Sequence, residues 1–213
     1  MEKGLLISFE GLDGAGKSTQ MSMLARWLEE QHVPFIYTRE PGGTPLGNEI
    51  RQLLLNRPEL AIVPLAETFL FQADRAQHFA TLVIPAIQEG KLVLTDRCFD
   101  ASIAYQGYAR GVDISLIEHL SLLATQGYKP DLTILLDIDP SEVHYRTDIT
   151  QDLSGTRERR TRFDVEAETF HQRVQEGFRA LARAYPERIK VIDASRTPEE
   201  IHQEIIGLVE VLL

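Results

Sequence analysis

The chain has 213 residues, of which 43% are hydrophobic and 25% charged, a composition that is ordinary for a globular protein. This length allows one α/β domain with a substantial core. The formal net charge of −10 argues against a nucleic-acid partner, so any basic site has to be a local pocket for a small anion.

The first predicted elements are a buried strand at residues 5–9, a glycine-rich loop and a helix. The loop is Gly11-Leu12-Asp13-Gly14-Ala15-Gly16-Lys17-Ser18 and matches the phosphate-binding pattern G-x-x-x-x-G-K-[ST]. Its glycines let backbone N–H groups surround a phosphate, and the helix adds the positive end of its dipole. Lys17 can reach the outer phosphates, and the Ser18 hydroxyl can ligate Mg²⁺. This stretch therefore predicts a nucleoside triphosphate site.

The rest of the chain alternates between strands and helices. Strands are predicted at residues 33–38, 92–95, 132–136 and 189–192. Helices are predicted at about 46–55, 64–88, 115–126 and 164–184, and after the N-cap sequence Thr197-Pro198. In the helix at 64–88, one face carries the apolar residues Leu65, Phe69, Ala73, Ala76 and Ala80. The alternation predicts a doubly wound, five-stranded parallel sheet flanked by helices, in a single domain over 1–213.

Residues 147–162 are polar and charged and contain almost no large apolar side chain, which predicts a mobile lid. Four arginines fall within the six residues 157–162. One interpretation is a solvated charge run, and the other is a lid whose arginine stabilises a phosphoryl group during transfer. The candidates for that arginine are Arg157, Arg159 and Arg160.

Ligands of parallel sheets bind at the carboxyl ends of the strands. Arg39 and Arg97 follow the second and third strands, and guanidinium groups suit phosphate oxygens. Asp96 and Asp137 also follow apolar strands, and either could hold the hydration shell of Mg²⁺. Asp96 is preferred because its strand is expected beside the phosphate-loop strand, whereas Asp137 is equally well explained as a turn former.

Cys98 is the only cysteine, which excludes an intrachain disulfide and is typical of a reducing compartment. The first strand follows Met1-Glu2-Lys3-Gly4 so closely that no signal peptide is expected. No apolar run approaches the roughly 20 residues that span a bilayer. These features predict a cytoplasmic protein without a membrane partner.

Three stretches together resemble thymidylate kinases (dTMP kinases): residues 9–20, residues 39–44 (Arg-Glu-Pro-Gly-Gly-Thr) and residues 96–107. Their order and spacing match that family along nearly the whole chain. The resemblance implies a P-loop NTPase fold of the nucleoside monophosphate kinase type. It also implies transfer of the γ-phosphoryl group of ATP to dTMP with Mg²⁺, giving dTDP and ADP for dTTP synthesis, and a homodimer.

The same resemblance implies roles for individual residues. The ATP site consists of Gly11, Leu12, Asp13, Gly14, Ala15, Gly16, Lys17, Ser18 and Thr19. The dTMP site consists of Asp13, Arg39, Phe71, Arg75, Arg97, Ser102, Tyr105 and Gln106. In it, Arg39 and Arg97 grip the phosphate, Phe71 or its neighbour on that helix stacks on thymine, and Arg75 binds a base carbonyl. Ser102 and Gln106 line the base and sugar pocket, and Tyr105 crowds the 2′ position and favours deoxyribose. Catalytic roles are implied for Lys17, Asp13, Arg97 and a lid arginine, and metal binding for Ser18 and Asp96.

The chain departs from the family at Cys98 and in the predicted lid, which begins with the acidic residues Asp148 and Asp152 rather than with a run of arginines. Family members usually carry an aromatic residue where this chain has Cys98. Some members place a catalytic arginine in the phosphate loop, but here the position is Gly14, so the chain resembles the bacterial type with lid arginines.

Two alternatives to dTMP phosphorylation follow from the phosphate loop. A related kinase could act on another nucleotide or a small-molecule acceptor, because a shared fold does not determine the substrate. A GTP-dependent switch would be expected to carry an Asn-Lys-x-Asp segment after a strand, and the sequence contains none.

Overall fold

The computed structural model describes residues 4–139, 163 and 166–213. Its centre is a five-stranded parallel sheet with the order β2-β3-β1-β4-β5, which confirms the predicted doubly wound sheet. The strands are β1 (Leu6–Gly11), β2 (Phe35–Arg39), β3 (Leu92–Asp96), β4 (Leu132–Asp137) and β5 (Ile189–Asp193). The helices are α1 (Lys17–Glu30), α2 (Pro45–Asn56), α3 (Pro64–His78), α4 (Ile84–Gln88), α5 (Phe99–Ser102), α6 (Ile114–Ala124), α8 (Glu168–Ala184) and α9 (Pro198–Glu210).

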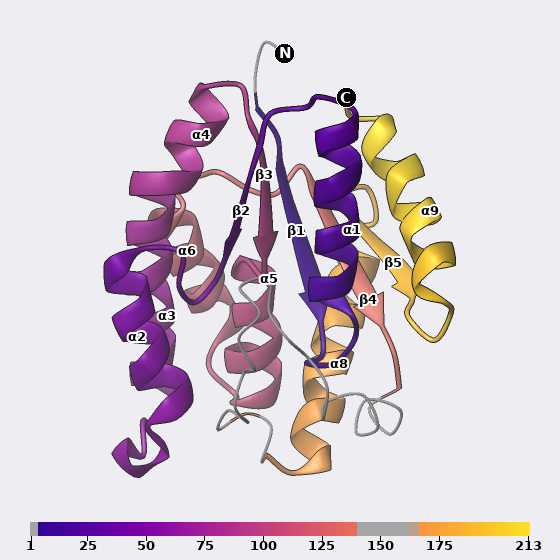
Figure 1. Ribbon diagram of the computed structural model, residues 1–213. Coiled ribbons are helices and arrows are strands. Elements are labelled where there is room, and N and C mark those ends of the chain that lie inside the picture. Colours follow the sequence, from indigo (N-terminus) through magenta and orange to yellow (C-terminus); the bar gives the residue numbers. More distant parts are fainter. Residues whose placement is uncertain (1–3, 140–162, 164–165) are drawn as a thin grey trace.

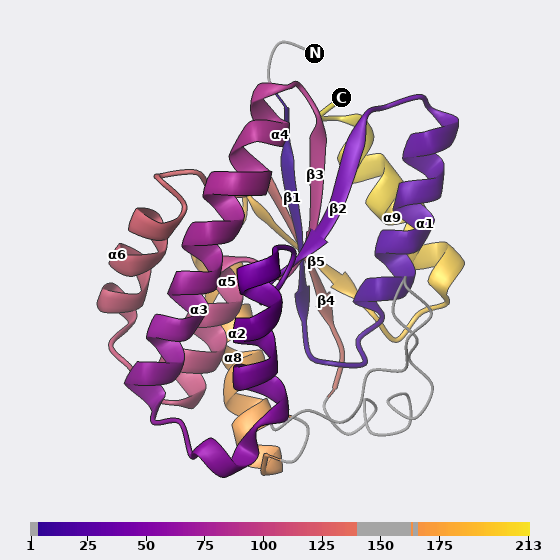
Figure 2. The same cartoon turned by 60° about the vertical axis from the view of Figure 1, so that its left-hand side comes forward.

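The helices form a layer on each face of the sheet. α1 and α9 pack against each other on one face, and the other helices cover the opposite face (Figures 1 and 2). The predicted helix at 64–88 is one helical path in which a π-helical segment, Phe79–Val83, separates α3 from α4. α9 begins with a capping box, because Thr197 Oγ1 accepts from Glu200 N and Glu200 Oε2 accepts from Thr197 N.

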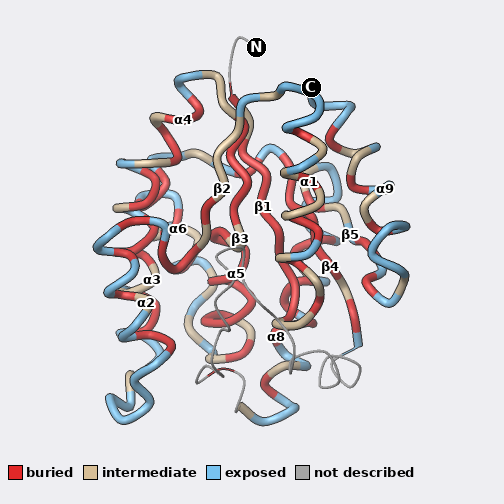
Figure 3. Tube along the Cα trace, in the orientation of Figure 1, coloured by how far each residue is buried: buried red, intermediate tan, exposed pale blue. Residues whose placement is uncertain are grey.

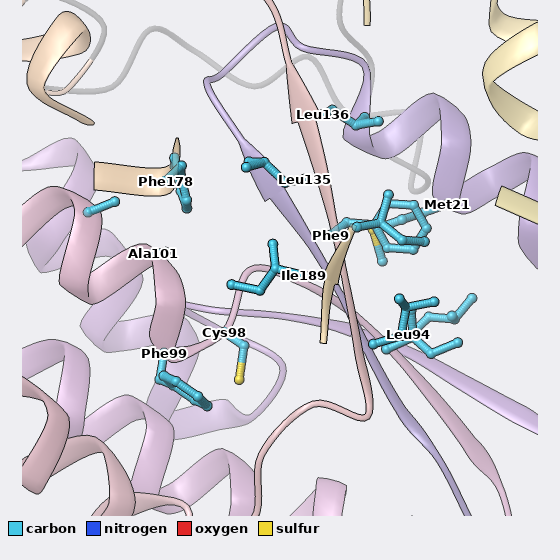
Figure 4. Packing of buried hydrophobic residues seen from close by; sticks show 14 of the residues in the cluster. Phe9, Met21, Leu94, Cys98, Phe99, Ala101, Leu135, Leu136, Phe178 and Ile189 are labelled. Atoms are coloured by element: carbon cyan, nitrogen blue, oxygen red, sulfur yellow. The ribbon is translucent and has the colours of Figure 1, made fainter. Parts of the chain in front are cut away.

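The strands read as apolar runs because both faces of the sheet are covered. β1 is buried along its whole length, and the burial colours of Figure 3 follow the sheet. Phe9, Met21 and Leu94 gather on one side of the sheet in Figure 4, while Cys98 and Phe99 lie on the other. None of the helices in the described part of the chain has the length and apolar character needed to cross a membrane.

The register of the strands brings the predicted site residues to one edge. Phe9 of β1 pairs with Asp96 of β3, and Asp96 pairs with Arg39 of β2. β3 is therefore the neighbour of the phosphate-loop strand, as expected. All strands are parallel, so the glycine loop after β1 lies at the same edge as Arg39 and Arg97, the lower edge in Figure 1.

α3 buries its polar face and exposes its apolar face, which is the reverse of an ordinary surface helix. Leu65 and Phe69, on its apolar face, are 46% and 51% exposed. Its buried positions are polar: Glu67, Thr68, Gln72, Asp74, Arg75 and His78. α3 thus presents hydrogen-bonding groups to the interior and leaves its hydrophobic stripe on the surface.

Candidate active site

The glycine loop turns the chain from β1 into α1. Gly14 (φ 83°) and Gly16 (φ 100°) occupy left-handed conformations that favour glycine. Lys17, the first residue of α1, is 6% exposed. Its Nζ donates to Leu12 O at 3.0 Å and to Gly11 O at 3.3 Å. The loop and the helix N-terminus thus hold one ammonium group and several backbone N–H groups at a single point, which is the arrangement that binds phosphate.

Arg97 connects this loop to the segment after β3. Its Nη2 donates to Asp13 Oδ1 at 2.6 Å and to the Tyr105 hydroxyl at 3.0 Å. The guanidinium carbon also lies 4.9 Å from the centre of the Tyr105 ring. Four predicted site residues, Lys17, Asp13, Arg97 and Tyr105, are therefore brought together, since Lys17 Nζ is 3.6 Å from Asp13 Oδ1.

The charged groups of this cluster shift one another's pKa values. Burial would raise the pKa of Asp13, but the Arg97 guanidinium and the Lys17 ammonium hold it well below its usual range. The Asp13 side chain is still 44% exposed, so water moderates these attractions. Burial, and then the charge of Arg97, lowers the pKa of Lys17, while Asp13 and Asp96 act in the opposite direction. Asp13 is consequently ionised at neutral pH.

Glu10 lies behind Arg97, and the sequence-based prediction missed it. Its side chain is fully buried, its Oε1 accepts from Cys98 N at 2.8 Å and its Oε2 is 3.8 Å from Arg97 Nη1. Burial raises the pKa of Glu10 to about 8 against the opposing effect of Arg97. The detectable signal was an ionisable residue inside an otherwise apolar strand, where an unpaired charge is costly.

Three buried polar atoms at this edge have no hydrogen-bond partner within the described residues. They are Glu10 Oε2, Arg97 Nη1 and Asp96 Oδ1. Buried polar groups are almost always hydrogen-bonded, so such atoms indicate a place where a ligand, an ion or water completes the site. Arg97 Nη1 is a donor, Asp96 Oδ1 is an acceptor and the protonated Glu10 carboxyl can act as either, a set that suits both an anion and a hydrated cation.

Arg75 of α3 is buried in the interior, where it contacts α5. It is 1% exposed, and its Nη1 donates to Ser102 Oγ at 3.1 Å and to Gln72 Oε1 at 3.0 Å. Its Nη2 donates to Cys98 O at 3.2 Å. Cys98, whose thiol is free and buried, thus holds Arg75 through its backbone carbonyl. Arg75 and Ser102, predicted from distant segments, are in direct contact.

Gln106 and Phe71 have partners that were not predicted. Gln106 Nε2 donates to Glu67 Oε1 at 2.7 Å. The Phe71 ring is 6.4 Å from the ring of Phe163, which lies 5.7 Å from Tyr105. Phe163 therefore joins the aromatic residues of the predicted base pocket.

The two candidate metal-binding aspartates differ in their surroundings. Asp137 Oδ1 accepts from Gln175 Nε2 at 2.9 Å, and its Oδ2 accepts from Arg179 Nε at 2.8 Å. α8 therefore occupies both Asp137 oxygens, whereas Asp96 Oδ1 has no hydrogen-bond partner among the residues that the structure describes. Within the described residues no group of three or more His, Cys, Asp or Glu could hold a metal ion. A protein cage is not expected for Mg²⁺, which usually binds through one or two carboxylates and the substrate phosphates.

Some predictions fall on residues that the structure does not describe. The lid at 147–162 and the arginines Arg157, Arg159 and Arg160 lie outside the described residues.

Comparison with known proteins decides the family. The family profile described as "Thymidylate kinase" matches residues 9–205. A thymidylate kinase of Carboxydothermus hydrogenoformans is 47% identical over 98% of both chains, and one of Pelotomaculum thermopropionicum is 44% identical over 99% of this chain and 95% of that protein. The chain belongs to the thymidylate kinase family. It is an ATP-dependent kinase that phosphorylates dTMP to dTDP, as the resemblance of its motifs implied.

The fold of the family is shared as well. The crystal structure of thymidylate kinase from Ehrlichia chaffeensis superposes with a TM-score of 0.77 at 33% identity, over 97% of this chain and 98% of that chain. Membership of the thymidylate kinase family sets aside the alternatives of another acceptor or a GTP switch.

Proposed function

We propose that the cluster at the carboxyl edge of the sheet is the site of dTMP phosphorylation. The observation that carries this proposal is the contact of Arg97 with both Asp13 and Tyr105, beside Lys17. This contact supports a place where the ATP and dTMP sites adjoin, because Lys17 belongs to the proposed ATP loop while Arg97 and Tyr105 belong to the proposed dTMP site. Positioning and electrostatic stabilisation, rather than covalent chemistry, then drive the transfer.

In this proposal the loop residues 11–19 bind ATP, with Lys17 on the outer phosphates. Arg39 and Arg97 bind the dTMP phosphate, and Asp13 holds Arg97 in place through their hydrogen bond. The base lies by Phe71, with Arg75, Ser102 and Gln106 as its polar contacts and Tyr105 at the sugar. Burial raises the pKa of the Tyr105 phenol, so its hydroxyl stays protonated and can donate to a ligand while it accepts from Arg97.

Mg²⁺ fits the residues at this edge. Asp96 Oδ1 is buried, has no hydrogen-bond partner in the described part of the chain, and is an acceptor of the type that holds a water of a hydrated Mg²⁺. We propose that Asp96 and the Ser18 hydroxyl hold the ion together with ATP phosphates. Bound there, Mg²⁺ would neutralise charge on the phosphate oxygens.

We also propose a homodimer that uses the apolar surface of α2 and α3. These helices pack side by side in both views (Figures 1 and 2). Their exposed large apolar residues, with those of the turn between them, are Leu46, Leu53, Leu60, Val63, Leu65 and Phe69. An apolar surface of this kind supports association. The wild type should have twice the 24.1 kDa chain mass by light scattering, and Phe69→Glu should yield monomers, whereas the exposed Val211→Glu should not.

A cytoplasmic location is the remaining proposal. Its support is the single cysteine, Cys98, which is buried as a free thiol.

The site assignment is tested by steady-state kinetics with ATP, Mg²⁺ and dTMP. Arg97→Ala and Arg39→Ala should raise the KM for dTMP, because each removes a fork-shaped phosphate donor worth about 1.5–3 kcal/mol, or roughly 10- to 100-fold. Arg97→Ala should lower kcat as well, since Arg97 also contacts Asp13. The exposed Arg26→Ala on α1 is the matched control. Unchanged dTMP kinetics in both variants would contradict the proposed acceptor site.

A further inference from the structure

Two reciprocal hydrogen bonds join the loop after β2 to α3. From the loop, Glu40 Oε2 accepts from Arg75 Nε at 2.8 Å. From the helix, Asp74 Oδ1 accepts from the Gly42 backbone N–H at 2.9 Å. Glu40, Asp74 and Arg75 are each 4% exposed or less, so both bonds are made out of water. The loop begins directly after Arg39, the last residue of β2, and the helix contains Arg75; these two arginines are the proposed phosphate and base contacts.

The surrounding packing restrains this connection further. Glu40 Oε1 is 3.0 Å from His78 Nδ1, and His78 Nε2 is 2.7 Å from Thr38 Oγ1. A Cβ atom on Gly43 would come within 2.5 Å of Thr38 Oγ1, and one on Gly47 within 2.4 Å of Asp74 Oδ1. The loop therefore cannot shift relative to α3 without breaking buried hydrogen bonds.

We propose that Glu40 and Asp74 are positioning residues that fix the phosphate-binding end of the dTMP site relative to its base-binding end. Glu40 sets the orientation of the Arg75 guanidinium, which reads the base. Asp74 sets the position of the turn at residues 39–43, which carries Arg39 toward the phosphate. This inference rests on the proposed function for the roles of Arg39 and Arg75.

The physical advantage is preorganisation. Arg75 binds Glu40 through Nε and Cys98 O through Nη2, so its plane is held before the base arrives. A flexible arginine would lose rotamer entropy on binding, and this loss would weaken the affinity for the base. The same reasoning applies to the glycine-rich turn, in which Asp74 holds the backbone N–H of Gly42.

The two residues act on different halves of the substrate, which separates this role from general stability. Thymidine contains the base but no phosphate, so it reports on Arg75 without Arg39. Loss of Glu40 should therefore weaken the binding of thymidine and the binding of dTMP by the same factor. Loss of Asp74 should weaken the binding of dTMP and leave the affinity for thymidine nearly unchanged.

The variants are Glu40→Gln, Asp74→Ala and Asp74→Asn, measured by calorimetric titration of the full chain at pH 7 with thymidine, dTMP and a non-hydrolysable ATP analogue. Burial, and then the charge of Glu40, raises the pKa of Asp74 to about 8, so the neutral acid predominates at pH 7 and Asn matches it. Asp131→Ala is the matched control, because Asp131 Oδ2 also accepts a backbone N–H, that of Leu6, at the opposite end of β1.

We expect Glu40→Gln to lower the affinities for thymidine and dTMP equally, by roughly tenfold, which corresponds to the loss of one charge-assisted hydrogen bond. Asp74→Ala should lower the affinity for dTMP by a similar factor but the affinity for thymidine by less than about twofold. Asp74→Asn should restore the affinity for dTMP. Affinity for the ATP analogue should be unchanged in every variant, and Asp131→Ala should bind all three ligands like the wild type.

Unchanged thymidine affinity in Glu40→Gln would overturn the role of Glu40. The role of Asp74 would be overturned if Asp74→Ala lost equal affinity for thymidine and dTMP, or if its affinity for the ATP analogue fell in parallel. The benchmark variants Arg39→Ala and Arg75→Ala test the underlying assignment separately. If Arg39→Ala leaves dTMP binding intact, the proposed function is wrong about the phosphate contact, whatever the two carboxylates do.

Discussion

Replacement of Lys17 by Ala should separate catalysis from folding. In the folded chain the ammonium makes two hydrogen bonds to loop carbonyls, at 3.0 and 3.3 Å, and an ion pair with the 44% exposed Asp13 at 3.6 Å. Net hydrogen-bond contributions of about 1 kcal/mol each are offset by the desolvation of the ammonium. We therefore expect the free energy of unfolding to change by less than about 2 kcal/mol, or about 4–8 °C in Tm at this chain length.

The effect on turnover should be much larger. The Lys17 ammonium is a preorganised donor at the helix N-terminus, and loss of such a donor costs about 2.7–4 kcal/mol of transition-state stabilisation, or 10²–10³ in kcat. Coupled ADP release at saturating ATP and dTMP measures kcat, and a thermal melt verifies folding. The matched control is Lys190→Ala, since Lys190 Nζ also donates to a backbone carbonyl, that of Pro186, at 2.8 Å. A folded Lys17→Ala enzyme with kcat within about threefold of the wild type would refute this account.

Two further predictions concern stability. Arg188 binds both oxygens of Asp100, at 2.6 and 2.9 Å, with the Asp100 side chain 1% exposed. Arg188→Ala should therefore lower the free energy of unfolding by about 3–5 kcal/mol, because it leaves a buried carboxylate unpaired. Urea denaturation measures this, and a loss below about 1 kcal/mol would contradict the structure. For Glu10, burial raises the pKa from 4.5 to about 8, so the folded state retains a proton that the unfolded state releases. Relative to Glu10→Gln, which cannot ionise, the wild type should lose stability as pH rises from about 4.5 to 8 and show no further change above 8. A stability difference that is constant from pH 5 to pH 9 would show that Glu10 does not titrate in this window.

Local patterns in the sequence determined a large part of this description. The glycine loop, the apolar strands and the helix caps are encoded by neighbouring residues, because turn conformations and strand burial depend on local spacing. Parallel strands also place their carboxyl ends at one edge, so the convergence of Arg39, Arg97 and Lys17 followed from the element order. The family followed from three motifs that extend along nearly the whole chain.

The tertiary structure decided which side of each element faces the site. Periodicity identifies an apolar face but does not say whether that face is buried, and α3 turns its apolar face outward because its polar face meets Glu40 and Ser102. The contacts of Arg75 with Glu40, and of Arg97 with Asp13, join residues 35 and 84 positions apart. Such pairings depend on how strands and helices pack across the sheet, and no local spacing encodes them. The buried Glu10 shows the same limit, since its burial is set by the elements packed around β1.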